Sequence, residues 1–101
     1  MMVSAKYNRK EAIIRNFEQF DWNFPEYGFK NWNSAIDHIN KRISSAMLLG
    51  NFQTTVKLPK SFSSITYKDC VNKYLKMYIE LFEYTVKEFE LENHVDLIIS
   101  W

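Results

Sequence analysis

The stretch "YTVKEFELENHVDLIISW", residues 84–101, decides the fold, because it reads either as the end of a helix or as two strands. Residues 84–91 are rich in β-branched and aromatic side chains, which favour strands. The tripeptide "ENH", residues 92–94, is typical of a tight turn before a second β segment. A lone strand here would leave more unpaired backbone exposed than a hairpin does. We therefore predict a hairpin of Tyr84–Leu91 with Val95–Trp101.

A helix precedes this hairpin. Its apolar residues are spaced to share one face: Val71, Leu75, Tyr78 and Phe82. We place its cap near Thr66, with Asp69 three residues later. The alternative is a longer third helix to about residue 91 with only two strands in the protein, because Glu83 and Lys87 are spaced as a favourable i,i+4 pair.

The clearest helix of the chain lies between residues 31 and 50. Its apolar side chains recur every three or four residues and form one stripe: Trp32, Ile36, Ile39, Ile43 and Met47. Asn31 or Asn33 can cap its start. Gly50 is expected to stop it, because glycine readily adopts the left-handed conformation at a helix end.

The remaining elements complete an α+β fold. "FQTTVKL", residues 52–58, alternates apolar and polar side chains as a half-buried strand does, and Pro59 ends it. Asn8 and Glu11 have the spacing of a capping box, which predicts a first helix over residues 8–20. The predicted order is α-α-β-α-β-β, with helices packed on one face of a small antiparallel sheet. At 101 residues, the chain is expected to be a single domain, residues 1–101.

An aromatic stretch, "FDWNFPEYGFKNW", joins the first two helices over residues 20–32 and contains six rings. Burying rings of this size stabilises a protein by roughly 1.5–3 kcal/mol each, so they are not expected to stay in water. Three destinations are open: the core of the domain, an interface with a partner or a second copy, or a stacked ligand. The predicted partner-binding residues are four aromatic anchors and two steering cations: Trp22, Phe24, Tyr27, Phe29, Lys30 and Arg42.

Charge and composition suggest an intracellular protein. The formal net charge is +1, but residues 1–60 carry +4 and residues 61–101 carry −3. This asymmetry suits self-association or an oriented encounter with a charged partner. Residues 1–10 lack the apolar region of a signal peptide, and no apolar run approaches the roughly 20 residues that cross a bilayer. The single cysteine, Cys70, fits a reducing compartment, so we expect a cytoplasmic protein.

The sequence contains no catalytic signature. It has no phosphate-binding loop, no GxGxxG, no GxSxG and no HExxH. His38 and His94 have no Cys or second His at metal-ligand spacing, and His38 is expected on the solvated flank of its helix. We therefore expect a protein that is not an enzyme and that uses no cofactor or metal.

Nucleic acid is a weak candidate partner, whereas a small nucleotide is a second hypothesis. The cations Lys30, Lys41, Arg42, Lys57 and Lys60 are interleaved with aromatic residues, and rings stack on bases while cations meet phosphates. A net charge of +1 is too small to grip a duplex, but sequestering one anionic nucleotide requires far fewer charges.

Residues 35–101 carry a resemblance. The matching segments are "AIDHINKRISSAMLLGNFQTTVKL", "YKDCVNKYLKMYIELFEYTVKEFE" and "VDLIISW". This succession, which ends in "ISW", resembles small accessory proteins encoded by bacteriophages of Gram-positive hosts. The resemblance implies a viral context, in which small non-catalytic proteins bind and block host factors, defence systems included. The leading hypothesis is an oligomeric protein of this kind that inhibits or sequesters a host factor in the host cytoplasm. The resemblance transfers no functional residues to this chain. A third hypothesis, a virion or assembly subunit, is motivated by the charge asymmetry between the two halves of the chain.

Overall fold

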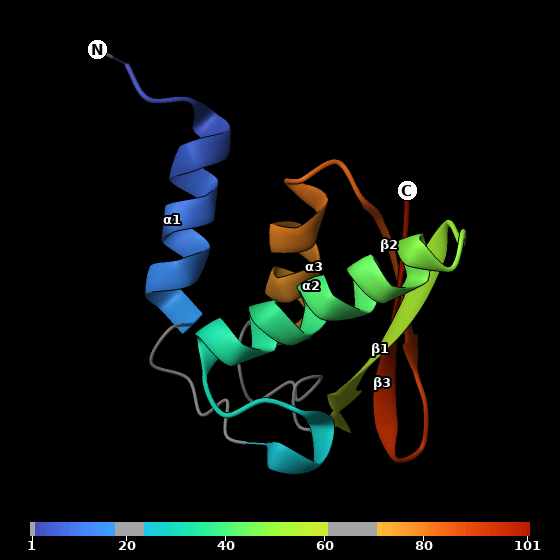
Figure 1. Cartoon of the computed structure of the whole chain (residues 1–101). Helices are drawn as coiled ribbons and strands as arrows, with labels where there is room; N and C mark the ends of the chain where they lie inside the picture. Colours follow the sequence, from blue (N-terminus) through green and yellow to red (C-terminus); the bar gives the residue numbers. More distant parts are fainter. Residues whose placement is uncertain (1, 18–23, 61–70) are drawn as a thin grey trace.

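The computed structural model describes residues 2–17, 24–60 and 71–101, and it has the predicted α+β architecture (Figure 1). The elements follow in chain order: α1 Ala5–Phe17, the 3-10 helix η1 Pro25–Tyr27, α2 Trp32–Leu48, β1 Gln53–Pro59, α3 Val71–Glu80, β2 Thr85–Glu90 and β3 His94–Ser100. The order α-α-β-α-β-β and the C-terminal hairpin are therefore confirmed. The cap predicted at Thr66 and Asp69 lies outside the described residues.

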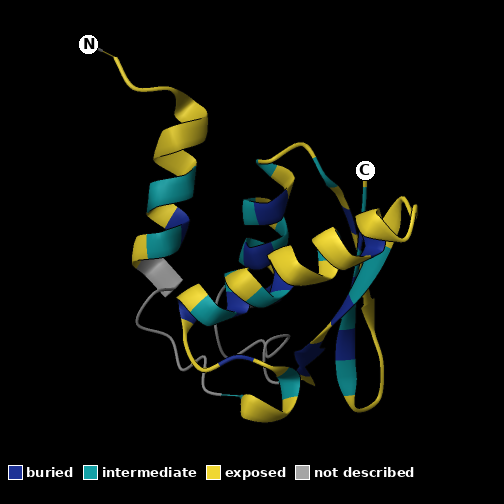
Figure 2. Ribbon diagram, viewed as in Figure 1, coloured by how far each residue is buried: buried dark blue, intermediate teal, exposed yellow. Residues whose placement is uncertain are grey.

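The sheet has the order β1-β3-β2, with both pairs antiparallel and β3 in the centre. Alternate residues of β3 are fully buried: Val95, Leu97 and Ile99. The register places Val56 and Leu58 of β1 and Val86 of β2 beside them, on the same face. Helices α2 and α3 cover this face and share its hydrophobic core, while α1 packs on α3 (Figure 2).

Helix α3 ends at Glu80, so the alternative of a helix to residue 91 is wrong. The next three residues form a turn in which Glu83 has a φ of 72°, a conformation that a continuing helix does not contain. The segment forms a hairpin instead of continuing the helix, because β2 pairs with β3 along six residues, from Thr85↔Ser100 to Glu90↔Val95. Local helical spacing in this segment gives way to the backbone pairing that a central strand requires on both sides.

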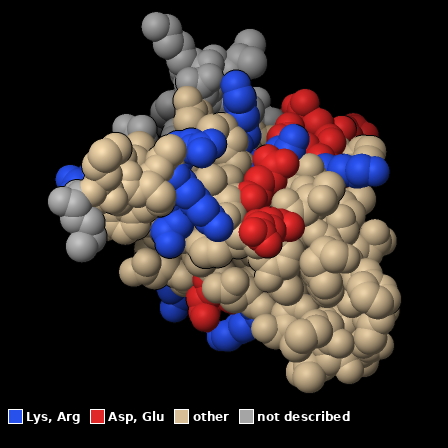
Figure 3. Space-filling model, turned by 90° about the horizontal axis from the view of Figure 1, so that it is seen from above, with Lys and Arg blue, Asp and Glu red and all other residues tan. Residues whose placement is uncertain are grey.

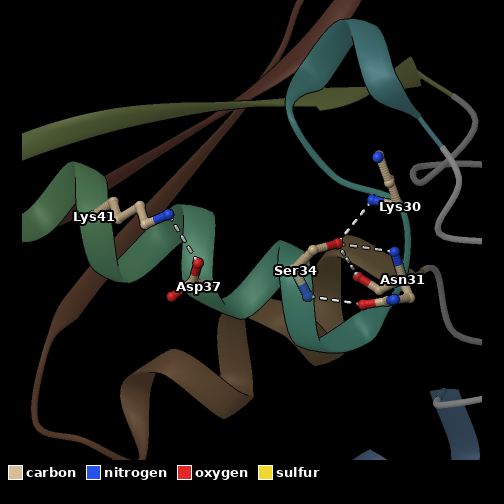
Figure 4. A network of polar contacts seen from close by, with 5 residues as sticks. All are labelled: Lys30, Asn31, Ser34, Asp37 and Lys41. Carbon is tan, nitrogen blue, oxygen red and sulfur yellow. Dashed lines mark hydrogen bonds and ion pairs between the residues drawn. The ribbon is translucent and has the colours of Figure 1, made fainter.

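The start of α2 is fixed by a reciprocal hydrogen-bond network, which selects Asn31 rather than Asn33 as its cap (Figure 4). The Ser34 backbone N–H donates to Asn31 Oδ1 at 2.9 Å. In return Ser34 Oγ accepts from the Asn31 N–H at 2.9 Å and from the Lys30 N–H at 2.7 Å. These bonds satisfy amide groups that a helix start leaves unpaired and fix where the aromatic stretch enters α2. One turn further, Asp37 forms an ion pair with Lys41 at 3.1 Å.

The end of α2 is a Schellman turn centred on Gly50. The Asn51 N–H donates to Ala46 O and the Gly50 N–H donates to Met47 O, both at 2.9 Å. Gly50 has a φ of 79°, in the left-handed region that other residues adopt at a cost. The predicted stop signal is confirmed.

Replacing Gly50 by alanine is expected to lower the free energy of unfolding by about 1 kcal/mol. A Cβ at this position would meet nothing within 4 Å, so the loss comes from the backbone conformation alone. Gly50→Asn should lose less, because asparagine tolerates the left-handed region. Urea denaturation measures both values; an equal loss in the two variants would contradict the conformational explanation.

Three predicted positions differ in the structure. Helix α1 begins at Ala5 instead of residue 8, because Ser4 caps it: the Tyr7 N–H donates to Ser4 Oγ at 3.1 Å. The predicted capping residue Asn8 lies inside the helix, and residues 18–20 of the predicted span lie outside the described part. Met47 and Phe52, both predicted to face the core, are exposed. Ala35 and Ala46 complete the buried face of α2 instead.

Asn72, in the first turn of α3, is a polar exception in the core. It is fully buried, and within the described part of the chain neither its amide nitrogen nor its carbonyl oxygen has a hydrogen-bond partner. Such a group destabilises the folded state because it loses water without compensation.

Among the described helices, none is long and apolar enough to cross a bilayer.

Candidate functional site

The described part of the aromatic stretch folds into a closed loop ahead of α2. Phe24 and Phe29 pair as an isolated antiparallel bridge. The Phe24 N–H donates to Phe29 O at 2.9 Å, and the Phe29 N–H donates to Phe24 O at 3.4 Å. Helix η1 and Gly28, at a φ of 95°, reverse the chain between them. The Tyr27 ring lies 6.5 Å from the Phe24 ring and 6.4 Å from the Phe29 ring. Pro25 and Gly28 thus serve to close a small aromatic knot.

The knot packs as a lid on the core. Phe29 is 1% exposed and belongs to the core cluster, and Phe24 and Tyr27 are half-buried against it. The domain itself therefore covers the Phe29 ring, which has almost no exposed surface in this structure for the partner contact predicted from the sequence. Lys30 and Arg42 are exposed, as steering cations should be. Trp22 lies outside the described residues.

Tyr27 and Arg42, two of the predicted residues, come together at a hollow between η1, α2 and edge strand β1. The hollow measures about 410 Å³. We call it the cationic hollow; its lining residues are Glu26, Tyr27, His38, Arg42, Thr55 and Lys57. Arg42 is held across the edge of the sheet, because its Nη2 donates to Thr55 O at 3.1 Å. Lys30 does not line the hollow.

His38 is half-buried beside the knot, so the prediction of a merely solvated side chain is wrong. Its ring lies 6.1 Å from the Phe29 ring, and a Cβ on Gly28 would lie only 3.0 Å from its Nδ1. Burial lowers the pKa of His38 below its ordinary value, and the nearby charges of Arg42 and Lys41 lower it further. Because the folded-state pKa is depressed, protonating His38 disfavours the folded state, and this destabilisation sets in as the pH falls below about 6.5.

Replacing Arg42 by alanine is expected to raise the pKa of His38, because one of the two cations that oppose its protonation is removed. The pKa should remain below the ordinary value, since burial, the larger cause, and Lys41 persist. NMR titration of the His38 ring protons measures the change. Lys87→Ala, which removes a cation from β2, is the control and should leave the pKa of His38 unchanged. If Arg42→Ala also left this pKa unchanged, the guanidinium would not act on the hollow.

A second surface lies where α2 ends and β1 begins. We call it the apolar corner; its residues and exposed fractions are Met47 56%, Leu48 81%, Leu49 79%, Phe52 74% and Trp101 38%. No charged residue occurs from Ile43 to Val56 or from Leu97 to Trp101. Figure 3 shows the result, a broad surface without charge at the lower right, on the side where α2 ends.

The backbone holds the corner in place. The turn at Gly50, which follows Leu48 and Leu49, is closed by hydrogen bonds to Ala46 O and Met47 O, and the Trp101 N–H donates to Phe52 O at 3.0 Å. The Trp101 ring meets the Tyr84 ring edge-on, with centroids 6.2 Å apart. The exposed rings and leucines therefore sit on an ordered frame rather than on a frayed end.

An apolar hollow between α2 and α3 adjoins the corner. It measures about 300 Å³. Its lining residues are Ile36, Ile39, Asn40, Ile43, Tyr78, Ile79, Phe82 and Tyr84. Ile43 stands one helical turn before Met47, and Tyr84 contacts Trp101, so the hollow and the corner meet along α2 and at the end of β3.

Sequence reasoning missed the corner, although a signal was present. Periodicity placed Met47 and Phe52 inward, and no regular pattern marks Leu48 and Leu49. The available signal was the fourteen-residue run without charge, Ile43–Val56, interrupted by a glycine that ends a helix. Such a run is expected in a core strand, and only the structure shows that nine of its fourteen residues are exposed.

The comparisons with known proteins give no relative: no family model matches the chain, and no curated protein or solved structure is significantly similar to it. Within the described residues, no group of three or more His, Cys, Asp and Glu side chains is placed to hold a metal ion.

Proposed function

We propose that this chain is a non-enzymatic binding protein that acts by contact between its apolar corner and another protein. The observation that carries the proposal is the exposure of the corner, where Leu48, Leu49 and Phe52 are each more than 70% exposed. Contiguous apolar surface of this kind is uncommon on proteins that work alone and marks interaction sites.

The area of the corner suits a protein partner. Fully accessible aromatic and large aliphatic side chains offer roughly 150–250 Å² each, so five at these exposed fractions offer on the order of 600 Å². A standard interface takes about 800 Å² from each partner, which the rim of the corner and the apolar hollow can complete. The hollow also gives one partner side chain a pocket to fill, the usual setting of a binding hot spot.

The chemistry of the partner surface follows from the absence of charge. A charged group buried opposite the corner would lose its water without gaining an ion pair. The matching patch is therefore apolar and uncharged, with charged groups only at its rim. Nothing in the corner reads a nucleic acid backbone, which requires cations.

The viral resemblance of residues 35–101 supplies the biological setting of the proposal. In that setting the partner is a host protein, a defence factor included, and the effect is inhibition by occupying its surface. The anchors differ from those expected from the sequence: leucines and rings of the corner replace the aromatic stretch, whose described rings pack on the core.

The test is affinity capture from host lysate with two baits, the wild-type protein and the double variant Leu48→Asp/Leu49→Asp, after the solution mass of each has been measured. In place of the oligomer expected from the sequence, the proposal expects a monomeric wild type that captures a protein which the variant does not. A wild-type dimer that the variant converts to monomers would overturn it, because a second copy would then occupy the corner. Equal capture by both baits would also overturn it.

A further inference from the structure

We propose that the cationic hollow binds a small organic anion that carries one phosphate and a planar ring, the chemistry of a nucleoside monophosphate. This site shares no residue with the apolar corner, so the inference is independent of the proposed protein contact. It is argued from charge, from the ring in the lining and from the size of the hollow.

Among the described residues, no carboxylate forms an ion pair with either cation of the hollow. In the described part of the chain, Lys41 pairs with Asp37 and Lys60 pairs with Glu90, whereas neither Arg42 nor Lys57 has a carboxylate within ion-pair distance. Arg42 is already positioned by its bond to Thr55 O, which leaves further guanidinium N–H groups for an anion. An arginine held in this way loses little conformational freedom when it binds a phosphate.

The opposing charges set the size of the anion. Among the described lining residues Glu26 is the one carboxylate, so with a neutral His38 these residues carry two positive charges and one negative charge. Asp96 stands across the strand register from Lys57 but is not among the lining residues. Its Oδ1 lies 3.0 Å from His94 Nε2, a contact that offsets its charge only when His94 is protonated. A net charge of +1 suits a single phosphate, and it disfavours a triphosphate or a nucleic acid strand, which need more cations.

The aromatic side of the hollow supplies the second point of recognition. Tyr27 is held by the Phe24 and Phe29 rings and is half-exposed at the lining, so a planar ring can stack on it without reordering the knot. The hollow, at about 410 Å³, falls within the roughly 300–1,000 Å³ of small-ligand sites. Glu26 can accept a hydrogen bond from a sugar hydroxyl or a base amine.

The experiment is an NMR titration of the ¹⁵N-labelled protein with AMP, with adenosine and inorganic phosphate as separate probes. We expect saturable shifts of Tyr27, His38, Arg42 and Lys57 with AMP, and at least tenfold weaker binding of either fragment. Arg42→Ala/Lys57→Ala should weaken AMP binding at least tenfold, because both charge-assisted contacts are lost. Both side chains are exposed, so the variant is expected to fold.

Lys87→Ala, which removes an exposed cation from the far edge strand β2, is the matched control and should bind AMP as the wild type does. The site would be overturned if AMP did not bind even at 10-fold the concentration at which ligands of this class saturate their sites. It would also be overturned if AMP bound the Arg42→Ala/Lys57→Ala variant as tightly as it binds the wild type. If inorganic phosphate or adenosine alone bound as tightly as AMP, the proposal that the hollow recognises both a ring and a phosphate would be wrong.

Discussion

Replacing Phe29 by alanine is expected to lower the free energy of unfolding by about 3–5 kcal/mol. The ring is 1% exposed in the core cluster and contacts both Tyr27 and His38, so its removal leaves a cavity under the aromatic knot. Domains of this size are stable by only about 5–15 kcal/mol, and the loss is therefore a large fraction of the total. Urea or guanidinium denaturation followed by circular dichroism measures it.

Lys30→Ala is the neighbouring control for this measurement. Lys30 is exposed and holds the start of α2 through its backbone N–H, which alanine retains. Its substitution should change stability by no more than about 0.5 kcal/mol. If Phe29→Ala left stability intact and weakened partner binding instead, the ring would be the surface anchor that the sequence suggested.

The double substitution Leu48→Asp/Leu49→Asp is expected to weaken partner binding at least 100-fold. Each leucine is about four-fifths exposed in the monomer and would be desolvated in the complex, so each carboxylate would be buried without a counter-ion. A loss of roughly 1.4 kcal/mol corresponds to a factor of ten, and two buried charges exceed twice this value. Stability should fall by no more than about 2 kcal/mol. Neither leucine contributes to the core, but both carboxylates would lie at the C-terminal end of α2, where the helix dipole disfavours each negative charge by about 0.3–1 kcal/mol.

Leu91→Asp/Asn93→Asp is the matched control, since it introduces the same two charges and removes one exposed leucine. These residues lie at the hairpin turn, at the opposite end of the sheet from the corner, because β3 runs from the turn at His94 to Ser100 beside Gln53. This variant should bind the partner as the wild type does. Equal losses in the two variants would indicate a general effect of negative charge and would contradict a specific corner.

Local signals in the sequence predicted most of the fold. The cap at Asn31 or Asn33, the stop at Gly50 and the alternation in residues 52–58 each depend on a few neighbouring residues, and the structure has a cap at Asn31, the stop and strand β1. The start of α1 was misplaced because Asn8–Glu11 imitates a cap that Ser4 provides one turn earlier. The end of α3 was ambiguous locally, and pairing with β3 decides it.

Burial was harder to predict than secondary structure. Periodicity tells which side chains share a face, but not whether another element covers the end of that face. Met47 and Phe52 follow the apolar pattern of α2 and β1, yet no described element lies over them. Phe29 was misjudged for the opposite reason: an irregular loop has no period, and only the Phe24–Phe29 bridge shows that its ring turns inward.

The same limit applies to the cationic hollow. The sequence selected Tyr27 and Arg42 as protein-binding residues and named Arg42 and Lys57 among the cations of a nucleotide hypothesis, but it did not predict that these three residues line one hollow. Their meeting with His38, Thr55 and Lys57 depends on the path of the knot and on the bond from Arg42 to an edge strand thirteen residues away. A contact of this kind has no local signature.

Amide hydrogen exchange of the protein with and without its captured partner is the most direct test of the apolar corner. If the apolar corner is the binding surface, the partner should slow amide exchange mainly in residues 47–52 and at Trp101, and exchange in residues 24–30 should be the same as in the free protein. Protection concentrated in residues 24–30, with the end of α2 exchanging as in the free protein, would contradict the account and return the binding role to the aromatic stretch.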